Sequence, residues 1–219
     1  MWLSLLNVLT GVTLFSGLDR LLTFFNFDGV YYGVHAFHNL LLVISTWKDV
    51  VVTFTNFNAI DVYSPNYEAI EFCFALHLYH CLLYWKKFRA DDWLHHGLMI
   101  GIALPLGCLI PSASLIGFNL FFTTGLPGGF DYAMLFCVRN GWVGRMEEKE
   151  YNRLLNVWIR SPGCQWHFAL TCVHMFRSVG PWYVKMAGFV PATLTYWNGQ
   201  YFMEQVVADH AVLLERTRS

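Results

Sequence analysis

The sequence predicts an all-α fold: a polytopic bundle of about seven transmembrane helices that forms one domain over residues 1–219. Two features of the composition predict it. Hydrophobic residues make up 56% of the chain and charged residues only 13%, against roughly 25% in an ordinary soluble domain, and the mean hydropathy is +0.40. The third observation is the pattern, because apolar segments of about 20 residues, enough to span a bilayer, recur along the whole chain.

The helices are expected in the following order, separated by short polar breaks. They are Trp2 to about Leu18 with a continuation through Leu21–Phe25, then Tyr31–Phe54, Tyr67–Trp85, Trp93–Ile110, Ser114–Val138, Gln165–Val184 and Ala187–Val207. Asn58–Asn66, with Asp61, Ser64 and Pro65, is expected to be a loop. Pro111 should end the fourth helix, and Pro127-Gly128-Gly129 should interrupt the fifth.

The segment 144–160 is the one long polar stretch of the chain. It begins with a charged run after Arg145 and continues with apolar residues at helical spacing. That pattern predicts a helix or loop on the membrane surface.

The distribution of Lys and Arg predicts the orientation. If the seven helices alternate in direction, eleven of these residues fall on the side that carries the C-terminus and three fall on the other side. Positively charged residues accumulate on the cytoplasmic side of membrane proteins. The N-terminus is therefore expected outside and the C-terminus inside, in the endoplasmic reticulum or the mitochondrial inner membrane.

The composition also bears on partners. The formal net charge is −1, and no basic stripe suggests nucleic acid as a partner. The six cysteines form no close Cys-x-x-Cys pair and lie mostly in apolar runs, which favours small buried hydrophobes over a disulfide or metal framework. The expected partners are membrane lipids and, if the chain is a subunit, other membrane proteins of a larger complex.

Histidines supply the candidate chemistry. Eight of the nine fall toward the inner membrane face, although the orientation was derived from Lys and Arg alone. Ionisable groups inside a membrane bundle are costly and default to functional candidates. The catalytic candidates are His95, His96 and Asp131. The ligand-binding candidates are His35, His38, His77, His80, Asn198 and Tyr201.

No metal or cofactor is predicted. Membrane di-iron enzymes carry several His-x-x-His-His boxes, whereas this chain has only Asp92-Trp93-Leu94-His95-His96 and no second His-His pair. Haem bound by two histidines stays open at this stage, because no spacing demands it and none contradicts it.

Several motifs resemble the TLC-domain family, named after the TRAM, LAG and CLN proteins and including the ceramide synthases. They are Val34-His35-Ala36, His95-His96-Gly97-Leu98-Met99-Ile100, Thr123-Thr124-Gly125-Leu126-Pro127 with the later Arg139, and Tyr196-Trp197-Asn198. The resemblance covers about 34–207. Thr123 occupies the family's acidic position and Met99 replaces a threonine, so the resemblance implies a scaffold that binds or modifies a lipid rather than acyl-CoA-dependent ceramide synthesis.

Three functions are therefore expected, in order. The first is a TLC-like protein of acyl-transfer or lipid-handling type, with one histidine of His95 and His96 as general base and the other orienting it. The second is a non-catalytic accessory subunit of a large membrane complex, such as a mitochondrial respiratory assembly. The third is a channel or transporter, which the polar row of the last helix and the break in the fifth would allow.

Overall fold

The computed structural model describes residues 4–60, 67–109 and 113–218, and within these ranges the chain is helical with no strand. Seven helical rods are formed. They are α1 (Leu5–Phe24), α2 (Val30–Thr55), α3 (Tyr67–Leu83), α4 (Ala90–Leu98) with η3 (Met99–Ala103) and α5 (Leu104–Leu109), α6 (Ala113–Leu120) with η4 (Phe121–Gly125) and α7 (Leu126–Arg139), α8 (Arg145–Leu155) with η5 (Asn156–Arg160) and α9 (Ser161–Arg177), and α10 (Trp182–Arg218). The predicted all-α fold is confirmed. Short 3-10 turns, η1 (Phe57–Ala59) and η2 (Trp85–Lys87), lie in two connections.

The fifth rod corrects one expectation, because it is not interrupted at Pro127-Gly128-Gly129. The helix runs through these residues, and its irregular part is the π-helical turn η4 immediately before them. Pro127 lies in the first turn of α7. A proline there is tolerated because its missing N–H group has least to lose at the start of a helix.

The segment 144–160 forms a helix, but not a detached one. It comprises α8 and η5 and continues into α9, so the sixth rod begins at Arg145 rather than Gln165. The rod packs against α7 and α10 along this segment. Its polar residues Glu148, Asn152 and Asn156 are buried in those contacts, a use that the charge pattern did not indicate.

Three expectations lie outside the described residues. These are the start of the first helix at Trp2, most of the loop Asn58–Asn66 with Asp61, Ser64 and Pro65, and the stop at Pro111.

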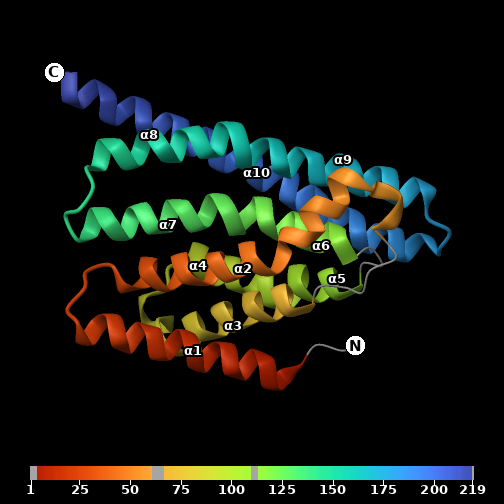
Figure 1. Cartoon of the computed structure of the whole chain (residues 1–219), viewed down its shortest axis with the longest axis horizontal. Helices are drawn as coiled ribbons and strands as arrows, with labels where there is room; N and C mark the ends of the chain where they lie inside the picture. The colour runs from red at the N-terminus through yellow and green to blue at the C-terminus, as the bar shows by residue number, and fades with distance from the viewer. Residues whose placement is uncertain (1–3, 61–66, 110–112, 219) are drawn as a thin grey trace.

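The seven rods run antiparallel to their neighbours in the chain, and the two termini lie at opposite ends of the bundle (Figure 1). One end, here called the cleft end, carries the connections around residues 25–29, 84–89 and 140–144. The opposite end carries those after α2 and α9. The central rod is α2, which packs against α1, α3, α6 and α7, while α10 lies along α8 and α9.

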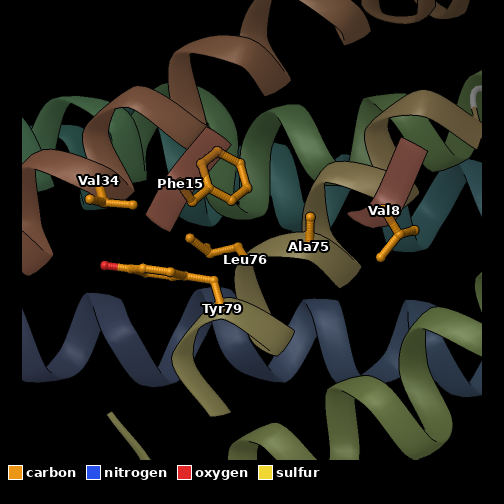
Figure 2. Close-up of a cluster of buried hydrophobic side chains, with 6 residues drawn as sticks. All are labelled: Val8, Phe15, Val34, Ala75, Leu76 and Tyr79. Atoms are coloured by element: carbon orange, nitrogen blue, oxygen red, sulfur yellow. The ribbon is translucent and has the colours of Figure 1, made fainter. Parts of the chain in front are cut away.

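A compact apolar cluster joins the first three rods (Figure 2). Its buried members are Val8 and Phe15 of α1, Val34 of α2, and Ala75, Leu76 and Tyr79 of α3. The helices approach closely here, because a Cβ atom added to Gly11 would lie only 2.6 Å from the Cβ of Ala75. A glycine at position 11 is therefore required by the packing of α1 on α3.

Polarity is distributed unusually between the interior and the surface. The buried residues include as many polar or charged side chains as hydrophobic ones. Large apolar side chains are exposed along several rods, among them Leu6, Ile44, Leu94, Trp158 and Phe176. One helix of the described residues, α1, is both long and apolar enough to cross a membrane, and only 17% of its most apolar stretch is buried.

Replacing Gly11 by alanine is expected to lower the melting temperature, because the new methyl group would push α1 away from Ala75. Overpacking of this kind typically costs about 1–3 kcal/mol. Gly17→Ala is the matched control on the same helix, since nothing lies within 4 Å of its added Cβ and alanine favours a helix over glycine by about 1 kcal/mol. Thermal unfolding followed by circular dichroism measures both, and a melting temperature for Gly11→Ala equal to or above that of Gly17→Ala would contradict the close contact.

Candidate functional site

An open cleft of about 830 Å³ lies at the cleft end of the bundle. Its lining comes from the α1–α2 connection, from α2, from the α3–α4 connection, from α4 and from the end of α7. The lining residues are Asp28, Gly29, Tyr31, Tyr32, Tyr84, Lys87, Phe88, Asp92, His96 and Arg139. Three separate stretches of the sequence, 28–32, 84–96 and position 139, therefore meet at one polar, aromatic surface.

Two local features join the α1–α2 connection to the end of α7, which together form one wall of the cleft. Asn140, at the end of α7, accepts a hydrogen bond from the Asp28 backbone N–H (3.1 Å) and donates one to the Asp28 carbonyl (2.9 Å). Gly29 has φ +69°, a conformation that side chains rarely adopt, and an added Cβ would lie 2.8 Å from Arg139 Cγ. The turn at Gly29 thus allows Arg139 to lie against it.

Each of the two cations of the cleft rests on a tyrosine ring. The Arg139 guanidinium lies 5.7 Å from the centre of the Tyr32 ring, and the Lys87 ammonium lies 5.4 Å from that of Tyr84. Such contacts stabilise a cation while leaving hydrogen-bond donors available. With Asp28 and Asp92 also present, the cleft offers both positive and negative groups to a ligand.

Five of the predicted histidines form a connected cluster behind the cleft. His96 of α4 contacts His80 of α3 through Nε2 and Nδ1 at 3.2 Å. The His80 ring stacks on His35 of α2, with centroids 4.5 Å apart. His77 lies 5.3 Å from both His95 and His96, measured between ring centroids. The predicted convergence of helices 2, 3 and 4 on one histidine layer is therefore observed for these residues.

When both rings are uncharged, hydrogen bonds fix the tautomers of the His80–His96 pair. The Nδ1 of His96 faces the Asp92 carbonyl oxygen at 2.8 Å and must donate its proton there, because a carbonyl only accepts. The Nε2 of His96 is then an acceptor, so His80 Nδ1 donates to it. The remaining nitrogen, His80 Nε2, therefore carries a lone pair, and this atom is buried without a hydrogen-bond partner.

The aromatic surroundings separate this pair from water. Phe88 stacks on His96 with centroids 4.4 Å apart, and Tyr31 stacks on His80 at 5.0 Å. Tyr132 of α7 closes the other side against His35 at 4.4 Å. His96 is 5% exposed and is the only one of these histidines that lines the cleft.

Asp19 of α1 is a member of the site that the sequence did not single out. One of its carboxylate oxygens, Oδ2, accepts hydrogen bonds from the hydroxyl groups of Tyr79 and Tyr84, both at 2.5 Å. Tyr84 lines the cleft, so Asp19 fixes one wall from behind. The available signal was a lone carboxylate in an otherwise apolar segment. No sequence pattern marked Tyr132.

The two members of the His-His pair differ sharply in position. His96 is buried, whereas His95 is exposed and reaches only His77 and the edge of His96. This difference follows from adjacent positions on a helix, which point about 100° apart. His38 makes no described ring contact with the cluster, although it lies within electrostatic reach of His35, His77 and His80. Its ring faces Phe15 of α1, and its Nδ1 pairs with the side chain of Asn39.

Three other predicted site residues are placed elsewhere. Asp131 faces α8 and η5, within electrostatic reach of Arg160, Glu148 and Lys149, and no described interaction joins it to a histidine. Asn198 accepts a hydrogen bond from Arg160 at 3.0 Å. Tyr201 is 42% exposed and stacks on Trp197 at the surface, so the predicted polar row of the last helix does not line a common cavity.

Among the described residues, no group of three or more His, Cys, Asp or Glu side chains is arranged to hold a metal ion. No protein-family model, curated protein or solved structure matches the chain.

Replacing Asp19 by alanine is expected to lower the free energy of unfolding by about 1–3 kcal/mol, because two tyrosine hydroxyls lose their acceptor. Tyr84→Phe should cost less, since it removes one of the two bonds. The double variant should lose less stability than the sum of the two single losses, because the two residues share one interaction. Chemical denaturation measures all three, and strictly additive costs would exclude the shared carboxylate.

Proposed function

We propose that the chain is a polytopic, TLC-like membrane protein whose cleft binds the polar headgroup of a lipid and whose His80–His96 pair acts on that group as a base. The observation that carries the proposal is the histidine pair itself. His96 lines the cleft and contacts His80, whose Nε2 atom is buried without a hydrogen-bond partner.

Membrane embedding is supported by where the apolar side chains lie. Exposed Leu, Ile, Phe and Trp residues cover the outer faces of several rods, while His, Asn, Asp and Glu face inward. This distribution suits a lipid solvent, in which polar groups must be satisfied inside the bundle. It also accounts for the modest hydropathy of rods other than α1, because their buried faces are polar.

The ends of the bundle differ in charge. Ten Lys and Arg residues lie toward the cleft end, three lie toward the opposite end, and Arg160 lies between them. Such asymmetry favours a cleft that opens to the cytoplasm or the mitochondrial matrix. Arg160, which the sequence assigned to the inner side, belongs to the interior of the bundle.

The cleft suits a headgroup better than a lipid tail. Lys87 and Arg139 can bind an anionic or carbonyl oxygen, and Asp28 and Asp92 can accept hydrogen bonds from a hydroxyl or amine. A tail would remain in the bilayer beside the apolar outer faces of α2 and α4. A hydroxyl or amine of the headgroup would then have to enter past Phe88 and His96 to reach His80 Nε2, which lies behind them.

The roles of the two histidines follow from their tautomers. His80 Nε2 takes a proton from a hydroxyl or amine of the lipid, which then forms a bond to the carbonyl carbon of an acyl donor. The bond to the donor's leaving group breaks, and the leaving group takes the proton back from His80. His96 is a positioning residue, because its Nε2 holds the Nδ1 proton of His80 and its Nδ1 is anchored on Asp92.

The resemblance to TLC proteins supports a lipid substrate, with one change in the machinery. Thr123, at the position of the family's acid, donates a hydrogen bond to Asn119 within its own rod at 2.6 Å. It lies on η4 and has no described contact with the histidines. The proposed base is therefore a histidine pair without a carboxylate partner.

Membrane integration is tested by fractionating expressing cells. The protein is expected in the membrane fraction, to remain there after alkaline carbonate washing, and to be released by detergent. An exposed tag at the C-terminus should be protease-accessible only from the cytoplasmic or matrix side. Release by carbonate alone would overturn the polytopic arrangement.

The histidine roles are tested by acyl transfer to a fluorescent long-chain amine or alcohol in proteoliposomes. His80→Ala is expected to lower the rate by about 10²–10⁴-fold, the usual contribution of a general base. His96→Gln should keep more activity than His96→Ala, because the glutamine oxygen can still accept the His80 proton. His95→Ala is the matched control and should leave the rate within about twofold. Activity that survives in His80→Ala would refute the assignment.

A further inference from the structure

A second row of buried polar side chains lies outside the histidine cluster, along the rod formed by α8, η5 and α9. We call it the polar seam. Its buried members are Glu148, Asn152, Asn156, Ser161, His167 and Thr171, each no more than 7% exposed. The rod and α10 lie side by side over most of their length (Figure 1), and α6 and α7 cover the seam from the other side.

The π-helical turn η5 makes the seam continuous. Glu148, Asn152 and Asn156 are four residues apart, so they share one face of α8. The next buried polar residue, Ser161, is five residues further on, which would point it away from that face in a regular α-helix. A π-helical turn repeats after about five residues. Because η5 spans Asn156–Arg160, it brings Ser161 and the rest of α9 into line.

Hydrogen bonds connect the first half of the seam. Asn156 Nδ2 donates to Asn152 Oδ1 at 2.6 Å, and Asn152 Nδ2 donates to Glu148 Oε1 at 3.4 Å. Toward the surface, the Lys149 ammonium lies 3.9 Å from the Glu148 carboxylate and 3.5 Å from the carboxylate of Asp209 on α10. The cleft end of the seam is thus a charged, accessible mouth.

The middle of the seam contains polar atoms that no protein group satisfies. Asn156 Oδ1, Arg160 Nε and Asp131 Oδ1 are all buried without a hydrogen-bond partner. They lie on η5 and on α7, which pack together. Hydrogen bonds between helices can explain a pair such as Gln200 and Ser161, but they leave these three atoms unsatisfied. An acceptor, a donor and a second acceptor suit one or two internal water molecules.

The second half of the seam reaches the opposite end of the bundle. His167 Nε2 pairs with the Thr171 hydroxyl at 3.3 Å, and His167 Nδ1 is another buried atom without a partner. One turn further on, His174 lines a small pocket of about 250 Å³ that Asn58 and Arg177 share. Titratable groups therefore stand at both ends of the seam and at two points within it, Asp131 and His167.

The helices around the seam are packed too closely for a solute. A Cβ added to Gly163 would lie 2.3 Å from the ring of Phe122, and one added to Gly199 would lie 2.7 Å from Cys164 Cβ. A hydrated ion needs an open pore, whereas a proton needs only a chain of side chains and single waters. The charge of Arg160, which would otherwise repel protons, lies within electrostatic reach of the opposite charge of Asp131.

We infer that the polar seam conducts protons across the membrane, between the Glu148–Lys149–Asp209 mouth and the His174 pocket, with Asp131 and His167 as carriers. From Glu148 to His174 the rod extends roughly 40 Å at 1.5 Å per residue, which exceeds the hydrocarbon thickness of about 30 Å. The inference rests on the proposed membrane embedding but is independent of the lipid chemistry at His80 and His96.

The test uses the full-length protein in liposomes that contain a pH-sensitive dye. A potassium diffusion potential set with valinomycin should drive proton uptake faster than in protein-free liposomes. Asp131→Asn and His167→Phe should each slow the protein-dependent flux by roughly tenfold or more, which corresponds to an activation barrier about 1.4 kcal/mol higher. Asp131→Glu keeps a carboxyl group and should retain most of the flux. His95→Phe, an exposed histidine outside the seam, is the matched control.

The outcomes separate the two proposals. A protein that floats with the liposomes and resists carbonate but adds no proton flux overturns the seam and leaves the membrane assignment intact. A protein that fails to insert overturns the membrane assignment, and the seam with it. A protein-dependent potassium flux as fast as the proton flux, measured in liposomes without valinomycin, would mean an open pore and would also overturn the inference. If the other variants insert poorly, two results still test the inference: the proton flux of the wild-type protein above that of protein-free liposomes, and the flux that Asp131→Glu retains.

Discussion

The arrangement of the helices depends on hydrogen bonds between polar side chains of different rods. Asp19 ties α1 to α3 through two tyrosine hydroxyls, and Glu71 receives the Ser4 backbone N–H and the Asn7 amide at the other end of the same pair. Asn119 of α6 accepts from Thr195 of α10 in the same way. When the outer surface is apolar, burial alone gives such helices little preference for one register over another. Directional bonds at both ends of a helix pair supply that preference.

The sequence was sufficient for the coarse architecture because length and apolar content are local properties. The seven rods and the convergence of His35, His77, His80 and His96 followed from the apolar segments, the alternating helix directions and the positions of the histidines along the helices. The extent of the sixth rod did not, because three polar residues of the segment 145–160, Glu148, Asn152 and Asn156, are buried against α7 and α10 rather than exposed. A polar helical face indicates that a partner is needed, but it does not say whether the partner is water or another helix.

The site was predictable in its residue types but not in its details. Adjacent histidines 95 and 96 are equivalent in sequence, and only the packing of α4 on α3 buries one and exposes the other. Asp131 and Tyr132 were similarly ambiguous, since a rotation of one residue decides which of them meets the histidines. Helix rotation likewise decides that Asn198 meets Arg160 while Tyr201 stacks on Trp197 at the surface. Helix rotation depends on contacts from distant parts of the chain, including Gly29 against Arg139.

The three π-helical turns have a mechanical consequence. Each holds one residue more than an α-helical turn, and its wider loop leaves the backbone less tightly bonded than the helix on either side. η3, η4 and η5 interrupt three of the seven rods, and η5 coincides with the unsatisfied atoms of Asn156 and Arg160. Such a turn can migrate along a helix by exchanging one hydrogen bond at a time, turning the intervening residues by about 100° without separating the rods. The bundle therefore contains points of helix rotation at its interior polar positions, and its exposed apolar face need not move when the inner face is rearranged.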